Sequence, residues 1–135
     1  MKFTGGCYCK ALRYEATEEP KIQSQCHCRE CQYISGGGPN YFMLVPVDHF
    51  TYTNGAPATF ARTDIDSAVT REFCITCGTH IATKRPGLGM VILKAGSLDD
   101  PSIYGKPGAA IYICDAQPYH HIPGDIPSFD KLPKR

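Results

Sequence analysis

Cys74-Ile75-Thr76-Cys77-Gly78 is the stretch that decides the fold, because it is one half of a metal-binding pattern. Two cysteines three positions apart and followed by glycine are typical of a zinc knuckle, since a residue without Cβ lets the chain turn beneath the ion. A second pair, Cys7 and Cys9, follows Gly5-Gly6, which offers the same freedom to turn. We predict that Cys7, Cys9, Cys74 and Cys77 form one structural zinc site of four thiolates. This site would fasten an N-terminal hairpin to the middle of a sheet, and much of the stability should depend on the ion.

A third cysteine group, Cys26-His27-Cys28-Arg29-Glu30-Cys31, places three thiolates within six residues. Catalytic zinc keeps three protein ligands and leaves the fourth position open, so we predict a second zinc held by Cys26, Cys28 and Cys31. His27 could be the missing ligand, but strand alternation places it on the opposite side of the chain from Cys26 and Cys28. Cys114 could arrive through space, although its apolar strand pattern favours a small buried hydrophobe. With three ligands, this second ion would be retained more weakly than the first and partly lost.

The alternative reading of eight cysteines in 135 residues is a disulfide framework. The segment Met1 to Cys7 has no basic stretch followed by an apolar run, which predicts no secretory leader and a cytoplasmic location. Cysteines two apart on an extended chain point to the same side and could share an ion, whereas bridging them would strain the disulfide dihedral. Metal is therefore the favoured interpretation, with two Zn²⁺ ions per chain as the predicted cofactors.

Length, composition and charge predict one domain over residues 1–135 that binds small or neutral partners. The chain is 42% apolar, and it has no run approaching the roughly 20 residues needed to cross a bilayer. The formal net charge is +1, with Lys and Arg scattered along the sequence. This distribution predicts neither a nucleic-acid partner nor a membrane surface.

The 13 Gly and 11 Pro interrupt every segment before a long helix could form, which predicts short, mostly antiparallel strands. Val91-Ile92-Leu93 is the most apolar run and should be central in the sheet, while Asn54-Gly55 is a tight-turn signal. One helix is expected over Arg29 to Ser35, ended by Gly36-Gly37-Gly38-Pro39. The predicted strands are Leu12 to Ala16, Ile22 to Gln25, Tyr41 to Val47, Phe50 to Thr53, Thr59 to Arg62, Val69 to Phe73, His80 to Lys84, Met90 to Ala95 and Ala109 to Cys114.

A zinc ion held by three thiolates is a net anionic centre, so it acidifies water less well than zinc held by three neutral imidazoles. A soft, thiolate-rich ion prefers another sulfur ligand and can keep a substrate thiol deprotonated at neutral pH. These properties predict a reaction that makes or breaks a carbon–sulfur bond, in which the thiolate attacks a small electrophile such as an aldehyde.

The order of these motifs resembles the glutathione-dependent formaldehyde-activating enzyme family, which includes the centromere protein V domain. The resemblance lies in Gly6-Cys7-x-Cys9, Cys26-His27-Cys28-x-x-Cys31, Phe73-Cys74-x-x-Cys77-Gly78 and Gly96-Ser97-Leu98-Asp99, and it covers nearly the whole chain. It implies a mainly β, Mss4-like fold of short antiparallel strands built around zinc sites. It also implies a carbon–sulfur lyase that joins glutathione and formaldehyde to S-hydroxymethylglutathione. In the family pattern the structural ligands are Cys7, Cys9, Cys74 and Cys77, and the catalytic ligands are Cys26, Cys28 and Cys31.

Some features bear on the substrate. Family members often carry a tryptophan near Ala116 to Pro123, where this chain has Tyr119, and the chain is short beside the formaldehyde-activating members. The glycines at 36–38 could form a loop over the metal. His120 and His121 could supply a proton to a developing alkoxide, although histidines in a Pro-rich segment are more often solvated.

The sequence leaves three other functions to consider. A non-catalytic zinc module that holds a protein partner would leave the second cysteine group empty or closed by a fourth ligand. A methionine sulfoxide reductase with Cys114 as nucleophile would leave Cys26, Cys28 and Cys31 unexplained. A thioredoxin-type role for Cys74 and Cys77 would require a βαβ setting, which the β-rich surroundings do not offer.

Overall fold

A computed structural model of the chain describes residues 2–133 and places ten strands, one α-helix and four short 3₁₀ helices within them. The elements are β1 (Phe3–Gly6), β2 (Arg13–Ala16), β3 (Lys21–Cys26), α1 (Arg29–Ser35), β4 (Asn40–Pro46), η1 (Val47–His49), β5 (Phe50–Asn54), β6 (Ala58–Phe60), β7 (Thr70–Phe73), β8 (His80–Lys84), β9 (Met90–Lys94), η2 (Ala95–Ser97), η3 (Pro101–Tyr104), β10 (Ala110–Ile111) and η4 (Ile113–Asp115).

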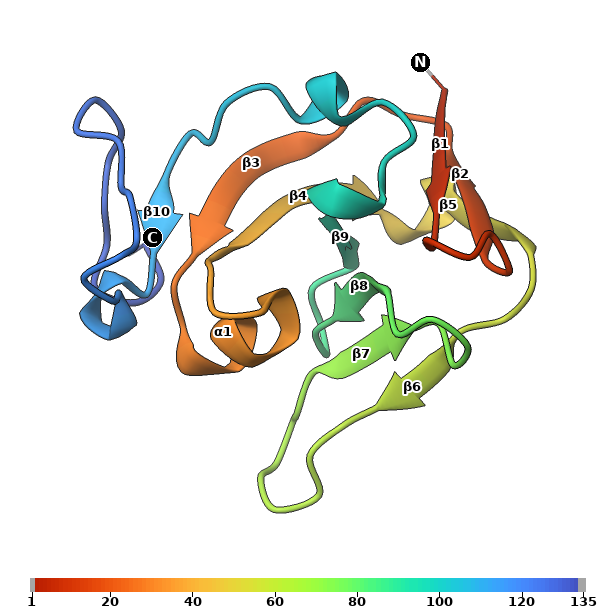
Figure 1. Cartoon of the computed structure of the whole chain (residues 1–135), viewed down its shortest axis with the longest axis horizontal. Helices are drawn as coiled ribbons and strands as arrows, with labels where there is room; N and C mark the ends of the chain where they lie inside the picture. Colours follow the sequence, from red (N-terminus) through yellow and green to blue (C-terminus); the bar gives the residue numbers. More distant parts are fainter. Residues whose placement is uncertain (1, 134–135) are drawn as a thin grey trace.

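The strands form two sheets (Figure 1). A three-stranded sheet has the order β1-β2-β5, and a seven-stranded sheet has the order β10-β3-β4-β9-β8-β7-β6. Neighbouring strands pair antiparallel except β10 and β3, which are parallel. The predicted mainly β fold of short antiparallel strands is confirmed. Strand β9, which contains Val91-Ile92-Leu93, is the middle strand of the larger sheet, as predicted.

Helix α1 begins and ends where the sequence predicted. Its C-terminal cap is Gly36, whose φ of 76° is the left-handed conformation that glycine adopts without a steric penalty. The Asn54-Gly55 turn is also present, with Gly55 at φ 73°. The turn joins β5 of the small sheet to β6 of the large sheet. These two strands do not pair with each other, so they do not form a hairpin.

Strand β1 was not among the predicted strands, because Gly5 and Gly6 have low β-propensity. Gly5 allows Ser97 and Tyr14 to lie close to the backbone of β1, and it does not make a turn. An added Cβ would lie 2.3 Å from the carbonyl oxygen of Ser97 and from the hydroxyl of Tyr14. The turn that follows β1 is made by Lys10, at φ 69°. The prediction that Gly5-Gly6 provides freedom to turn is therefore wrong.

The last predicted strand is shorter than expected, because Tyr112 adopts a left-handed conformation with φ 54°. Strand β10 ends at Ile111, and Ile113–Asp115 forms η4. Cys114 consequently lies on an exposed turn, so the expectation that it is a buried hydrophobe is wrong.

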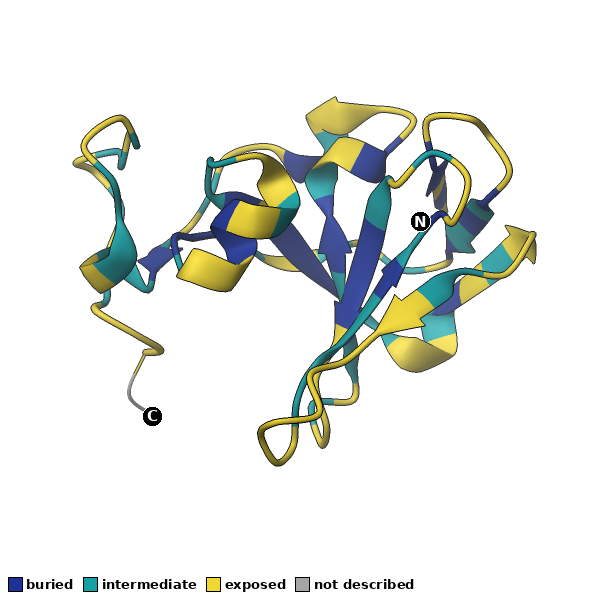
Figure 2. Ribbon diagram, turned by 60° about the horizontal axis from the view of Figure 1, so that its bottom comes forward, coloured by how far each residue is buried: buried dark blue, intermediate teal, exposed yellow. Residues whose placement is uncertain are grey.

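The two faces of the seven-stranded sheet have different roles, because successive side chains of a strand point to opposite sides. On β4, Met43 and Val45 enter the main core, which the large sheet shares with the small one. Phe42 and Leu44 point to the other face, where they form a smaller cluster with Cys26 and Cys31. Figure 2 shows the buried strands at the centre of the molecule, with α1 beside them. Among residues 2–133, no helix combines the length and apolar character needed to span a bilayer.

Candidate metal centres and the adjoining cavity

Four cysteines meet where the two sheets join. Cys7 and Cys9 lie in the β1–β2 turn, Cys74 and Cys77 lie in the β7–β8 turn, and their four sulfurs lie within 4.8 Å of one another. The Sγ–Sγ distance is 3.6 Å between Cys7 and Cys9 and 3.7 Å between Cys9 and Cys74. A tetrahedral zinc with Zn–S bonds of about 2.3 Å requires sulfurs about 3.8 Å apart. The four residues therefore fit a zinc ion.

The backbone around this group points N–H donors at the sulfurs. The N–H of Leu12 donates to Cys7 Sγ at 3.2 Å, and the N–H of Cys77 donates to Cys74 Sγ at 3.5 Å. Gly78 turns the chain at φ 79°, as the zinc-knuckle pattern predicted. Such donors stabilise negative charge on sulfur, so this loop geometry suits thiolates.

The three-cysteine group is built at the junction of β3 and α1. Cys26 ends β3, Cys28 is the N-terminal cap of α1, and Cys31 lies in its first turn. The cap is made by sulfur, because the N–H of Cys31 donates to Cys28 Sγ at 3.3 Å, the role that a Ser or Asp oxygen usually has. The three sulfurs lie within 4.8 Å of one another, so this cluster also could hold a metal ion. The side-chain hydrogen bonds that Cys28 makes with Cys26 and Cys31 lower the pKa of Cys28.

All eight cysteines are free thiols, so the structure has no disulfide framework. The seven grouped cysteines meet as four and three, and Cys114 belongs to neither group.

His27 points away from its neighbouring cysteines, as strand alternation predicted, and it is fully buried. Its Nδ1 lies 2.9 Å from His120 Nδ1, and its Nε2 lies 2.8 Å from the side-chain nitrogen of Gln25. His120 Nε2 lies 2.7 Å from the carbonyl oxygen of Gly37 and must donate to it. His120 Nδ1 is then the acceptor, His27 Nδ1 donates to it, and Gln25 donates to His27 Nε2. Two neutral imidazoles thus satisfy the whole chain of hydrogen bonds.

This network corrects one expectation about the C-terminal histidines. His120 is half-buried and holds its segment against the glycine loop, so the expectation that it is solvated is wrong. His121 is exposed, as expected. Tyr119, which stands where the family often has tryptophan, donates its hydroxyl to the same Gly37 carbonyl at 3.0 Å.

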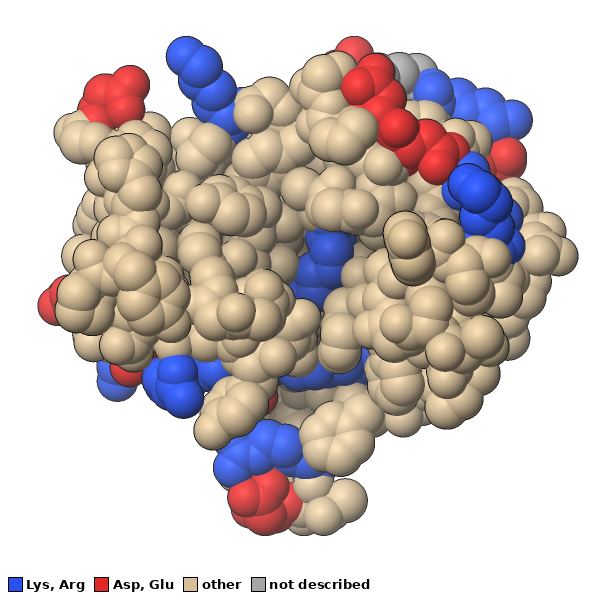
Figure 3. All heavy atoms as spheres, viewed as in Figure 1, with Lys and Arg blue, Asp and Glu red and all other residues tan. Residues whose placement is uncertain are grey.

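A cavity of about 390 Å³ lies on the face of the large sheet that carries the three-cysteine cluster. Its floor consists of alternate residues of adjacent strands, which share a face because the strand period is two. In Figure 3 a hollow opens at the centre of the molecule, with basic side-chain atoms at its bottom. The lining includes Cys26, Cys28, Cys31, Ser24, Phe42, Leu44, Ile92, Lys94, Thr83, Val69, Arg71, Arg85, Ile111 and Tyr112.

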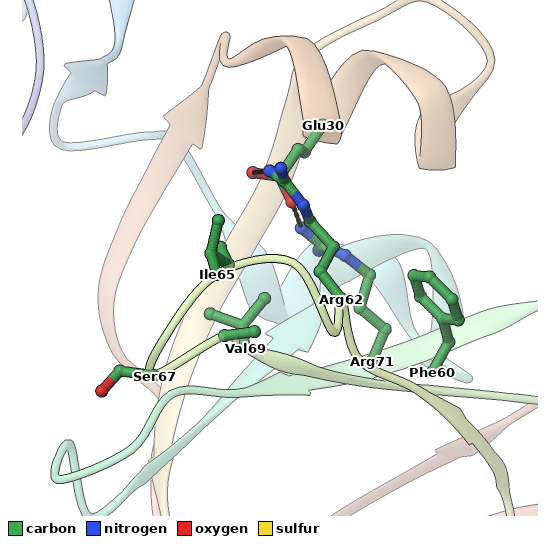
Figure 4. A pocket seen from close by; sticks show the side chains of 8 residues that line it. Glu30, Phe60, Arg62, Ile65, Ser67, Val69 and Arg71 are labelled. Atoms are coloured by element: carbon green, nitrogen blue, oxygen red, sulfur yellow. Dashed lines mark hydrogen bonds and ion pairs between the residues drawn. The ribbon is translucent and has the colours of Figure 1, made fainter.

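The charged groups of this cavity are mostly cationic. Lys94, Arg71 and Arg85 line it together with one carboxylate, Glu30. Arg71 donates to Glu30 at 3.0 Å, and Arg62 lies 3.8 Å from the same carboxylate. Figure 4 shows Glu30 reaching from α1 toward these two guanidinium groups. Since Glu30 is already neutralised, the cavity has an excess of positive charge beside the cysteine cluster.

Lys94 and Thr83 were not predicted as site residues. Lys94 follows Val91-Ile92-Leu93 in a strand predicted to be central, so a lysine there was the available signal for an unusual buried cation. Its face could not be assigned until the register of β9 against β4, which pairs Lys94 with Phe42, was known.

The fold and these clusters define a class: a mainly β protein with two cysteine groups, of four and three residues, that could hold metal ions. The family model of the glutathione-dependent formaldehyde-activating enzyme matches residues 2–115, and the chain belongs to this family. A crystal structure of a Rhodobacter sphaeroides protein has a similar fold, with a TM-score of 0.58 and 16% identity over 77% of this chain and 96% of the other. None of the curated proteins matches the chain.

Proposed function

We propose that the protein is a zinc-dependent carbon–sulfur lyase that forms or cleaves the adduct of a small thiol and a small aldehyde, with glutathione and formaldehyde as the first substrates to test. The observation that carries this proposal is the three-cysteine cluster at the wall of the 390 Å³ cavity. A cluster that served only as a structural clamp would not need such a cavity. Membership of the family supports the choice of substrates.

In this proposal Cys26, Cys28 and Cys31 hold a catalytic zinc ion. Bound there, the ion would supply an open position at which an incoming thiol is kept deprotonated. The protein's own groups do the rest. The junction of β3 and α1 fixes the three sulfurs, while Phe42, Leu44 and Ile92 give the cavity apolar walls beside them. Arg85, which lines the cavity and is exposed, makes it attractive to a carboxylate of a thiol such as glutathione.

Cys7, Cys9, Cys74 and Cys77 hold the structural zinc in this proposal. The two turns that carry them belong to different sheets, and the N–H of Tyr8 reaches across to the hydroxyl of Thr79 at 3.1 Å. An ion at this junction would connect segments 65 residues apart in sequence. Its contribution is therefore to the fold, with no substrate position required.

The proposal is tested by measuring catalysis of an equilibrium that also runs without enzyme. Exchange NMR on a mixture of glutathione and formaldehyde reports the rate at which the free thiol and its hydroxymethyl adduct interconvert. The zinc-loaded protein should raise this rate, Cys28→Ser should abolish the increase, and Cys114→Ser should leave it unchanged. An unchanged rate with the zinc-loaded wild-type protein would contradict the proposal and favour a non-catalytic zinc module.

A further inference from the structure

Lys94 is the most unusual charged group of the cavity. Lys94 is only 7% exposed, and its side chain lies on the same cavity-facing side of β9 as Ile92. Among residues 2–133, no carboxylate forms an ion pair with it. Burying an unpaired ammonium is costly, so a fold that keeps one usually has a use for its charge.

The ammonium of Lys94 is held in place by one hydrogen bond, which Nζ donates to Thr83 Oγ1 at 2.9 Å. The same hydroxyl lies 3.4 Å from Arg71, so Thr83 lies between two cations. Because an ammonium has three N–H groups, this arrangement leaves two donors available to the cavity that Lys94 and Thr83 both line.

Lys94 also lies within electrostatic range of the cysteine cluster. Burial lowers the pKa of Lys94 to about 8, while the neighbouring Cys31, Cys26 and Cys28 act to raise it. The other two cations of the cavity are less suited to meet a new charge. Arg71 is committed to Glu30, and Arg85 is exposed at the rim.

We propose that Lys94 is a catalytic residue that donates a hydrogen bond to the substrate oxygen on which negative charge develops during carbon–sulfur bond formation. This inference rests on the proposed function. When the thiolate sulfur adds to the carbonyl carbon, its lone pair forms the new carbon–sulfur bond, the carbon–oxygen π bond breaks, and that electron pair moves to oxygen. The oxygen then takes a proton from water, which replaces the proton that the thiol released to solvent. In the cleavage direction the same steps run in reverse.

A fixed donor at this position stabilises the oxygen anion more than the neutral carbonyl, which is the requirement for lowering the barrier. This stabilisation requires little reorganisation, because Thr83 already holds the ammonium and Lys94 itself is largely buried. Loss of one such donor typically lowers kcat by about 100- to 1000-fold.

Three variants test this role. Lys94→Met keeps an unbranched side chain, one atom shorter, and removes the charge. Lys94→Arg keeps the charge, and Thr83→Val removes the acceptor that positions Nζ. We expect Lys94→Met to lower kcat by about 100-fold or more, and Lys94→Arg to retain a larger share of the activity. Both should keep the metal content of the wild-type protein.

A binding measurement provides the second readout. S-carboxymethylglutathione carries an anionic oxygen close to sulfur, and S-ethylglutathione is its neutral counterpart; neither can react. Calorimetry on the zinc-loaded protein should show that the wild type prefers the carboxymethyl compound by about tenfold or more, and that Lys94→Met loses the preference.

The outcomes separate this inference from the proposed function. Suppose that the wild-type protein catalyses exchange and that the kcat of Lys94→Met lies within twofold of the wild-type value. This result would overturn the role of Lys94 and leave the proposed function standing. Loss of the second ion from Lys94→Met with an unchanged ligand preference would overturn it too, because Lys94 would then serve only the thiolates. If the wild type fails to catalyse exchange, the proposed function falls, and the two thioethers still decide whether Lys94 receives an anionic oxygen.

Discussion

The two cysteine groups use the same ligand atom and differ in how the chain presents it. The four-cysteine group draws its sulfurs from two turns on different sheets, 65 residues apart at their closest connection. The three-cysteine group lies on one continuous strand-to-helix junction and lines a cavity that carries an excess of positive charge. In the proposed function the group that joins distant segments serves the fold, whereas the group beside the cavity has room for a fourth ligand from outside. The number of cysteines and their surroundings are thus the basis for predicting a structural zinc in the four-cysteine group and a catalytic zinc in the three-cysteine group.

The largest effect should follow from breaking the four-cysteine group. Cys74→Ser should lose one zinc ion and destabilise the protein by roughly 5 kcal/mol or more, enough to unfold a domain of ordinary stability. Metal analysis and thermal unfolding followed by circular dichroism measure both losses. The exposed Cys114→Ser is the matched control, which should stay within about 0.5 kcal/mol of the wild type. A stable Cys74→Ser protein with one ion fewer would show that this site is not structural.

Breaking the three-cysteine group should give the opposite pattern. Cys28→Ser should release the second zinc ion and abolish the proposed activity, yet leave the fold intact, because this ion joins residues only a few positions apart. We expect a fall in Tm of only a few degrees, with secondary structure unchanged by circular dichroism. Global unfolding of Cys28→Ser would remove the distinction between the two groups.

The sequence allowed much of this comparison to be predicted, because cysteine spacing and strand alternation are local properties. The spacing within each cysteine group, the direction of His27 away from Cys26 and Cys28, and the end of α1 at Gly36 all follow from residues close in the chain. The pairing of Cys7 and Cys9 with Cys74 and Cys77, in contrast, was inferred from the number of ligands that zinc requires. Strand β1 was missed because Gly5 pairs only when the β2 partner and Ser97 come close. The cavity and Lys94 were missed for a related reason: they depend on the register of six strands, β3, β4, β7, β8, β9 and β10, which no local pattern contains.

The His27–His120 hydrogen bond should have an intermediate effect. His120→Leu removes the acceptor for His27 Nδ1 and one donor to Gly37, which should destabilise the protein by about 1–3 kcal/mol. Hydrogen exchange should quicken for the backbone amides around the glycine loop and for residues 116–121. His121→Leu, at the exposed neighbouring position, is the control that should leave both measurements close to the wild type. Equal exchange rates in the two variants would show that the network does not hold this segment.

The smallest effect concerns an ion pair that supports the four-cysteine side of the molecule. Asp99 accepts hydrogen bonds from Arg13 at 3.0 Å and from Thr4 at 2.6 Å, and these lower its pKa to about 2. The pKa of Asp99 in the folded protein lies below its value near 4 in an unfolded chain. The stabilisation of the fold by ionised Asp99 is therefore complete above pH 4 and is lost as the pH falls to 2. Asp99→Asn should cost less than about 1 kcal/mol at pH 6, since the pair is partly exposed. When the free energy of unfolding is measured as a function of pH, the difference between the wild type and Asp99→Asn should shrink below pH 4. A difference that stays constant would contradict this account.

The most direct test of the central claim is a thiol titration of the protein loaded with cobalt in place of zinc, followed by absorption spectroscopy. The account predicts two ions per chain, of which one changes its sulfur-to-cobalt charge-transfer bands when glutathione is added, while the other keeps the spectrum of a closed four-thiolate site. The responsive spectrum should be missing in Cys28→Ser and unaffected in Cys114→Ser. Two ions whose spectra both ignore glutathione would contradict the account, since both coordination shells would then be complete without a substrate.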